Sequence, residues 1–359
     1  MLAVNSGGTK GDSSAEPFLR RPGRHALSTM MSAIRTSLHL SALTLSACLV
    51  AGCANGNAIN LPLSDRGNIQ LPADTAKPLF DLLTFDGRRN LLYVAHTSNN
   101  TIDIVDTQGR KVLASIPGIA GVKQVALTAD PDVVFASASA GGEVVLIDTR
   151  AMKVLARISV NGSPDAIDYD SGHDTAVVAS AGAKELSLID RSTRKVTSTI
   201  KLPGTPELLT VDPKGGRAFV SINDKDEVAV VDLVTSQVTE LRGCDIKAPT
   251  GIAYDGDQDR LFVADRGLVS VIDVLIDKCL GSVDIGNGVD QITLNPHKHH
   301  LYTANGGSRN LSVIDTVSLQ PLGEVGTGPS GDGVAADPAT DLVYVIVGRA
   351  GIIAVYHDP

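Results

Sequence analysis

One unit of about 42 residues recurs along most of this chain. An Asp that follows two apolar residues marks the end of a strand in each unit, and successive copies lie 42, 42, 42, 41 and 42 residues apart. The copies are Asp106, Asp148, Asp190, Asp232, Asp273 and Asp315, and one more step of 42 ends at His357. A fixed period of about 40–45 residues with several short strands is typical of propeller blades. We therefore predict an all-β, seven-bladed β-propeller with four-stranded antiparallel blades.

A second marker ends an earlier strand of each unit. Its copies are Asp86, Asp130, Asp170, Asp212, Asp255, Asn295 and Asp337. Asp and Asn side chains accept hydrogen bonds from backbone N–H groups shortly after them and so initiate turns. Each unit is then read as an innermost strand a, followed by b, c and an outermost strand d. The two markers begin the a–b and c–d turns, so we expect them to be structural and not catalytic.

The last unit ends after three strands, so we expect its fourth strand from elsewhere. Residues 67–72 (GNIQLP) resemble the d strands of other units and would close the ring, which leaves no exposed sheet edge. We assign residues 67–359 to the propeller and residues 53–66 to a linker. Residues 1–29 mix Gly, Ser, Pro and Arg without periodicity, and we expect a disordered or non-native leader there.

Residues 30–52 have the pattern of an export signal: basic residues, an apolar run at 40–50, then small residues. The run is shorter than the roughly 20 apolar residues of a membrane span. Residues 50–53 (VAGC) resemble the lipobox of bacterial lipoproteins, which implies that Cys53 carries lipid. Ala54, in place of Asp, favours the outer membrane. We expect an exported protein anchored on the periplasmic face of a membrane; the alternative is a buried apolar helix that ends at an unrelated Cys.

Composition excludes one class of partner. The net charge is −9, aromatic residues make up 3% of the chain, and Trp is absent. Nucleic-acid binding needs a basic surface and is often helped by aromatic stacking. We therefore expect no nucleic-acid partner.

The repeats resemble a known family. Residues 301–316 (LYTANGGSRNLSVIDT) and 342–345 (LVYV) are similar to the YVTN repeat of YncE-like seven-bladed propellers. The resemblance covers roughly residues 65–359 and implies a propeller of the cell envelope. A fold does not define an activity. One YncE-like propeller is thought to bind single-stranded DNA through aromatic side chains, and this chain departs from that pattern.

The register predicts a layer of acidic side chains at one opening of the central channel. Five residues before each a–b marker stand Asp81, Val125, Asp165, Glu207, Thr250, Asp290 and Asp332. Crowded carboxylates raise one another's pKa or attract a cation, and oxygen ligands suit Ca²⁺. Asp165, Glu207, Asp290 and Asp332 are thus candidate Ca²⁺ ligands; alternatively, the carboxylates only keep a wide, hydrated opening soluble. The b–c loops on this face add His96, Arg266 and Arg349 as candidate ligand-binding residues.

Two further groups have weaker signals. His297, His299 and His300 have metal-like spacing, but they lie in an a–b turn on the opposite face, where we expect solvated side chains. Export would favour a bond between Cys244 and Cys279. The register places them at opposite ends of neighbouring d strands, beyond the Cα separation of roughly 7 Å that a disulfide allows. We expect them to be unpaired.

These features favour a binding or scaffold module of the cell envelope, with a protein or small-molecule partner at the acidic opening. One alternative is a metal-dependent lactonase- or lyase-like hydrolase, in which the five carboxylates hold a cation and His96 acts as acid or base. Another is an accessory protein of a periplasmic redox enzyme. We expect a monomer, and no cofactor other than the candidate Ca²⁺.

Overall fold

The computed structural model describes residues 63–74, 77–241, 244–329, 331 and 333–359. The predicted leader, export signal and lipidated Cys53 lie outside these residues, as does Asp332. In the described part of the chain, no helix has the length and apolar character needed to cross a membrane.

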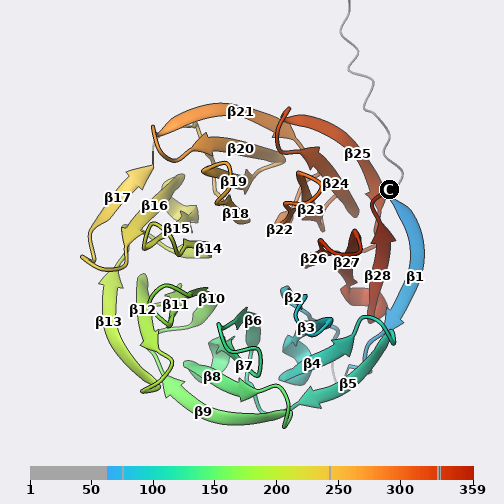
Figure 1. The fold of residues 1–359 in the computed structure, drawn as a ribbon, viewed down its shortest axis with the longest axis horizontal. Helices are drawn as coiled ribbons and strands as arrows, with labels where there is room; N and C mark the ends of the chain where they lie inside the picture. The colour runs from blue at the N-terminus through green and yellow to red at the C-terminus, as the bar shows by residue number, and fades with distance from the viewer. Residues whose placement is uncertain (1–62, 75–76, 242–243, 330, 332) are drawn as a thin grey trace, which may run out of the picture. The chain divides into compact units, whose positions relative to one another are not determined.

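Seven four-stranded antiparallel sheets form a ring around a central channel (Figure 1). Blade 1 holds β2 (Leu83–Asp86), β3 (Leu91–His96), β4 (Thr101–Asp106) and β5 (Lys111–Ile116); blade 2 holds β6 (Val122–Leu127), β7 (Val133–Ala138), β8 (Glu143–Asp148) and β9 (Lys153–Ser159). Blade 3 holds β10 (Pro164–Asp170), β11 (Thr175–Ser180), β12 (Glu185–Asp190) and β13 (Lys195–Lys201); blade 4 holds β14 (Pro206–Asp212), β15 (Arg217–Ile222), β16 (Glu227–Asp232) and β17 (Val238–Leu241). Blade 5 holds β18 (Ile252–Asp255), β19 (Arg260–Asp265), β20 (Leu268–Asp273) and β21 (Lys278–Asp284); blade 6 holds β22 (Val289–Asn295), β23 (His300–Asn305), β24 (Asn310–Asp315) and β25 (Gln320–Gly326). Blade 7 holds β26 (Val334–Asp337), β27 (Leu342–Val347), β28 (Ile352–His357) and β1 (Ser64–Gln70). The predicted fold is confirmed.

The ring closes as predicted, through an N-terminal strand in blade 7. β1 pairs antiparallel with β28, from Ser64 opposite His357 to Gln70 opposite Ile352. The closing strand therefore begins at Ser64, three residues before the predicted boundary. This pairing completes the fourth strand of blade 7 and covers the edge of β28, whose N–H and C=O groups would otherwise be unpaired.

The two ends of the ring carry different connections. We call the end with the d–a and b–c connections the mouth face, and the end with the a–b and c–d turns the turn face. The marker Asp residues form the expected turns: Asp106 Oδ1, for example, accepts hydrogen bonds from the N–H groups of Gln108 and Gly109. In blades 4 and 6, Asp232 and Asp315 accept hydrogen bonds from the equivalent backbone N–H groups.

The core lies between neighbouring sheets. The third residue of strand b is a fully buried aromatic ring in six of the seven blades: Tyr93, Phe135, Phe219, Phe262, Tyr302 and Tyr344. Blade 3 has Val177 at this position. The few aromatic residues of the chain are thus concentrated at one repeated site, where each large ring fills the space between two twisted sheets.

One a–b marker was assigned wrongly. β6 ends at Leu127, so Thr128, and not Asp130, takes the marker position of blade 2, 42 residues from both Asp86 and Asp170. Thr128 is buried, and its Oγ1 donates to the carbonyl groups of Asp130 and Val133. Asp130 has the right residue type but lies two positions too late.

The expectation that Cys244 and Cys279 are unpaired is wrong. The two residues form a disulfide, with their Cα atoms 4.8 Å apart. The error came from extending strand d of blade 4 as far as Cys244. β17 has only four residues and ends at Leu241, and Cys244 packs with the apolar cluster between blades 4 and 5. Cys244 therefore lies against blade 5, with its Sγ also near the Val271 carbonyl of β20, and not at the end of a full strand d in its own blade.

Candidate functional site

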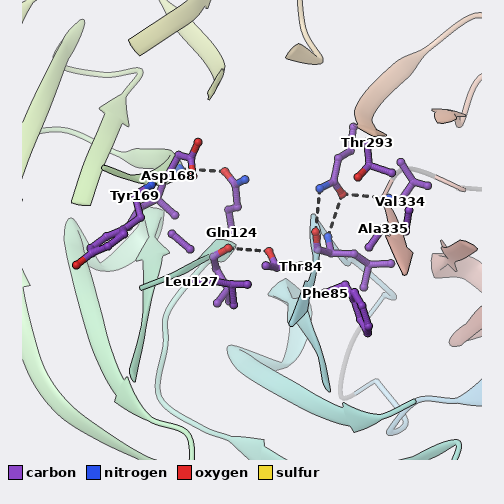
Figure 2. Close-up of a pocket in the computed structure, with 15 residues that line it drawn as sticks. Thr84, Phe85, Gln124, Leu127, Asp168, Tyr169, Thr293, Val334 and Ala335 are labelled. Atoms are coloured by element: carbon purple, nitrogen blue, oxygen red, sulfur yellow. Dashed lines mark hydrogen bonds between the residues drawn. The ribbon is translucent and has the colours of Figure 1, made fainter. Parts of the chain in front are cut away.

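The central channel contains two adjoining cavities. One cavity of about 320 Å³ is lined mainly by the inner strands β2, β6, β10, β22 and β26, and another of about 210 Å³ by β14, β18 and β22. Both are lined by Gln124, Asp168, Gln291 and Thr293, so the two cavities meet in the same channel. Figure 2 shows Gln124, Asp168 and Thr293 together with the inner strands that carry them.

The predicted charged layer forms at the mouth face, but with one different member. With Thr128 as the blade 2 marker, the residue five positions earlier is Lys123 and not Val125. Val125 is buried between blades, whereas the Lys123 Nζ lies 2.8 Å from Asp81 Oδ2 and 3.8 Å from Asp165 Oδ1. The ammonium of blade 2 therefore bridges the carboxylates of blades 1 and 3.

The layer also includes Glu207, Thr250 and Asp290. Burial lowers the pKa of Lys123, but the charges of Asp81 and Asp165, with a smaller one from Asp290, outweigh it and raise the pKa overall. Burial raises the pKa of Glu207, repulsion by Asp165 raises it further, and Lys123 partly offsets both. The described part of the layer thus holds four carboxyl groups and one ammonium.

The layer does not have the geometry of a metal site in this structure. No group of three or more His, Cys, Asp or Glu side chains within the described residues is arranged to hold a metal ion. Lys123 already takes the place between Asp81 and Asp165 that a cation would occupy, so Ca²⁺ would have to displace it. Of the predicted Ca²⁺ ligands, Asp165, Glu207 and Asp290 lie in the described layer.

Deeper in the channel, long polar side chains tie neighbouring blades together. Gln291 Oε1 accepts hydrogen bonds from the N–H groups of Leu83 and Val334, and its Nε2 donates to the Leu83 carbonyl. Gln124 Oε1 accepts from Ile167 N–H (Figure 2). The innermost strand of each blade has no further strand on its channel side, so these amides satisfy backbone groups that would otherwise depend on water.

Among the described residues that line the two cavities, Asp168 is the one with a carboxyl group. Its Oδ1 accepts from Tyr169 N–H and its Oδ2 from Val211 N–H of the next blade, both at 2.8 Å. Burial raises the pKa of Asp168 to about 6; the two N–H donors lower it and repulsion by Asp170 adds to the increase. The charge of the channel interior therefore changes near neutral pH.

Lys123, Gln124, Asp168 and Gln291 were not predicted as site residues. Lys123 holds the layer position of blade 2, which the misplaced marker concealed. Gln124, Asp168 and Gln291 are polar residues of inner strands, but they do not recur at one position in every blade, so the repeat pattern does not single them out.

His96 lies inside blade 1 and does not reach the mouth. Its ring is fully buried and stacks on Phe80, with 4.1 Å between ring centroids. Nδ1 lies 2.7 Å from Asp103 Oδ2, and Nε2 lies 2.9 Å from Asp74 Oδ1. Burial lowers the pKa of His96, but the hydrogen bonds and charges of Asp103 and Asp74 outweigh it and raise the pKa. The residue thus fastens the segment between β1 and β2 to blade 1.

The two predicted arginines lie on b–c connections of the mouth face. Arg266 is exposed in the tight turn between β19 and β20. Arg349 is exposed in the short 3₁₀ helix η4 (Gly348–Ala350) and lines a separate cavity of about 380 Å³ with Lys77, Pro78 and Leu79.

The three histidines of residues 297–300 do not form one cluster. The His297 side chain is exposed, whereas the His300 ring is mostly buried and Nδ1 is hydrogen-bonded to Asp358. Tyr302 donates its hydroxyl to the same carboxylate. His300 therefore holds the C-terminal segment against blade 6.

Comparison with known proteins supports the fold. No family model and no curated protein match this chain. One similar solved structure is a chain of Kuenenia stuttgartiensis hydrazine synthase, with a TM-score of 0.70, 16% sequence identity, and coverage of 79% of this chain and 96% of that chain. At this identity the likeness shows the seven-bladed β-propeller fold alone, and the resemblance to YncE-like propellers stays a prediction.

Proposed function

We propose that this protein is a binding module of the bacterial cell envelope whose ligand carries positively charged groups and docks at the mouth of the channel. The observation that carries this proposal is the layer of four carboxyl groups from blades 1, 3, 4 and 6 around one ammonium from blade 2. Each charge belongs to a different blade of a hydrogen-bonded ring. Their positions are therefore fixed before a ligand arrives, and little entropy is lost on binding.

The ligand's charge follows from electrostatics. Glu207 is a partly buried carboxyl group, and electrostatic repulsion from the neighbouring Asp165 destabilises its charged form. A primary amine or guanidinium placed beside both would relieve this repulsion and form charge-assisted hydrogen bonds. The export signal at residues 30–52, lipidation at Cys53 and attachment to the outer membrane belong to the same proposal and rest on the sequence pattern.

The test is a calorimetric titration of the full chain with spermidine, in low salt and in 0.5 M NaCl. The wild-type protein should bind with a salt-sensitive affinity, and Asp165→Asn with Glu207→Gln should weaken binding about tenfold or more. A control with Asp257→Asn and Asp277→Asn removes equal charge from the turn face and should bind as the wild type does. Equal losses in the two variants would show that net charge, and not the mouth, attracts the ligand.

A second candidate, an accessory protein of a redox enzyme, draws on the likeness to the hydrazine synthase chain. That likeness is one of fold alone. An oxidoreductase that co-purifies with the wild type and is lost from the Asp165→Asn, Glu207→Gln variant would favour it. The hydrolase alternative requires a bound metal, so a rise in melting temperature with Ca²⁺ that EDTA reverses would support it.

A further inference from the structure

Three neighbouring c–d turns present apolar side chains to solvent. Val234 of blade 4, Leu275 and Ile276 of blade 5, and Val317 of blade 6 are 70%, 68%, 66% and 55% exposed. We call these four residues the apolar arc. They are four of the six large apolar side chains that stand out as exposed in the described ranges of the chain. Blades 4, 5 and 6 are consecutive in the ring, so their three c–d turns follow one another on one side of it (Figure 1).

The turn itself does not require these residues. Two positions after the marker Asp, blades 4, 5 and 6 have Val234, Leu275 and Val317. The same position is occupied in blades 1, 2 and 3 by Gln108, Arg150 and Ser192. In blades 1, 2, 4, 5 and 6 the marker carboxylate accepts the backbone N–H of this residue, whatever its side chain. The fold therefore does not require apolar side chains at these turns. Exposed apolar patches of this kind are typical of surfaces that contact a partner.

The first strand of the described chain, β1, begins at this same face. Ser64, the first residue of β1, pairs with His357 at the end of β28. In blade 5 the equivalent pair is Asp273 and Lys278, which flank the c–d turn with Leu275 and Ile276. Ser64 thus lies at the position where blade 7 would have the end of its own c–d turn, and blade 7 is next to blade 6.

The length of the chain between Cys53 and Ser64 limits its reach. Cys53, the candidate lipid attachment site, lies 11 residues before Ser64. An extended chain of that length spans at most about 40 Å. A lipid on Cys53 would therefore hold Ser64, at the turn face, within about 40 Å of the bilayer.

We propose that the apolar arc rests in the surface of the lipid bilayer and turns the channel mouth away from it. This inference rests on the lipid anchor of the proposed function. Leu, Ile and Val side chains at the end of a rigid turn can enter the boundary between headgroups and acyl chains, where binding grows with the apolar area buried. Asp232, Asp273 and Asp315 stand at the base of these turns, so a zwitterionic surface fits better than an anionic one.

The absence of Trp makes a direct test simple, because one introduced Trp is the only indole in the protein. Leu275→Trp reports on the arc, Ser192→Trp on the equivalent turn of blade 3, and Leu79→Trp on the mouth face. The full-length lipoprotein is reconstituted into phosphatidylcholine vesicles that contain lipids with brominated acyl chains, which quench nearby indoles. We expect several-fold stronger quenching for Leu275→Trp than for Leu79→Trp, with Ser192→Trp between them.

Two additional measurements complete the test. Adding Val234→Ser and Val317→Ser, which introduce the residue type of blade 3, to the Leu275→Trp variant should reduce its quenching. Replacing half of the phosphatidylcholine with phosphatidylglycerol should also reduce it, because the carboxylates of Asp232, Asp273 and Asp315 stand at the base of the arc.

The outcomes separate this inference from the proposed anchor. If the protein floats with the vesicles but Leu275→Trp is quenched no more than Leu79→Trp, the anchor stands and the inference is overturned. If the protein does not float, the anchor has failed; quenching of Leu275→Trp by added vesicles would then still support contact of the arc with lipid, and its absence would overturn it. A blue shift that grows with protein concentration without vesicles would assign the arc to a second copy of the chain instead.

Discussion

Replacing Asp168 with Asn should alter how the stability of the protein depends on pH. The pKa of this carboxyl group is raised from its ordinary value of 3.8 to about 6 in the folded protein, chiefly by burial. A carboxyl group with a raised pKa binds its proton more tightly in the folded state. Its favourable contribution is therefore present at low pH and is lost as the pH rises from about 4 through 6.

The size of the effect follows from the shift. Two pKa units correspond to about 3 kcal/mol between acid and pH 8, since each unit is worth 1.36 kcal/mol. Water in the channel screens the charge, so we expect about 2 kcal/mol, roughly half of it lost below pH 5. The amide oxygen of the Asp168→Asn variant would still accept one of the two backbone N–H groups, and the unpaired one should cost about 1–3 kcal/mol at every pH.

The assay is urea denaturation of the wild type and of Asp168→Asn at intervals from pH 4 to pH 8. The informative quantity is the difference in the free energy of unfolding between the two proteins, because the other titrating groups contribute equally to both and cancel. That difference should shift in favour of the variant by about 2 kcal/mol as the pH rises. A constant difference would show that Asp168 titrates normally and that the channel is too wet to shift its pKa.

Three other predictions concern the disulfide, His96 and Lys123. Cys244→Ser with Cys279→Ser should lower the free energy of unfolding by about 4 kcal/mol, because the bond closes a loop of 35 residues; an unchanged urea midpoint would contradict it. His96→Gln should destabilise the protein more at pH 6 than at pH 8.5, because Asp74 and Asp103 raise the pKa of His96 and that contribution disappears as the pH rises; equal losses of melting temperature at both pH values would count against this. Lys123→Met should leave Asp81 and Asp165 without their shared ammonium, so Ca²⁺ should raise the melting temperature of this variant more than that of the wild type; an equal response would show that Lys123 does not occupy a cation position.

The fold was predictable because its signal is repeated seven times. A single misplaced marker could not alter the number of blades, and β1 could be assigned to blade 7 because that unit lacked a strand. The charged layer depended on the exact register of each blade. In blade 2, Asp130 was assigned as the marker in place of Thr128, two residues earlier. The predicted layer therefore contained Val125, an apolar residue, at the position where the structure has the ion-paired Lys123. This one blade changed the predicted charge of the opening, because the ammonium of Lys123 was left out of a layer of carboxylates.

The disulfide and the inner polar layer were beyond the reach of the periodic pattern. Cys244 lies where β17 is cut short, and a repeat average gives every blade a full outer strand. Gln124, Asp168 and Gln291 bond to backbone groups of other blades, so their partners are determined by ring geometry and not by sequence neighbours. His96 was placed on the mouth face because it ends strand b, but Asp74 and Asp103 hold its ring inside the blade.

The pairing of β1 with β28 also determines how this domain can form. The Ser64 hydroxyl donates to the His357 carbonyl across 293 residues of chain, so the contacts that close the ring bridge almost the whole domain. Such contacts raise the contact order and slow folding. Blade 7 differs from the other blades only in how its outer strand is connected. A circularly permuted chain that joins residue 359 to residue 64 and opens at another c–d turn would therefore have the same seven blades. Its new ends would lie on the same turn face.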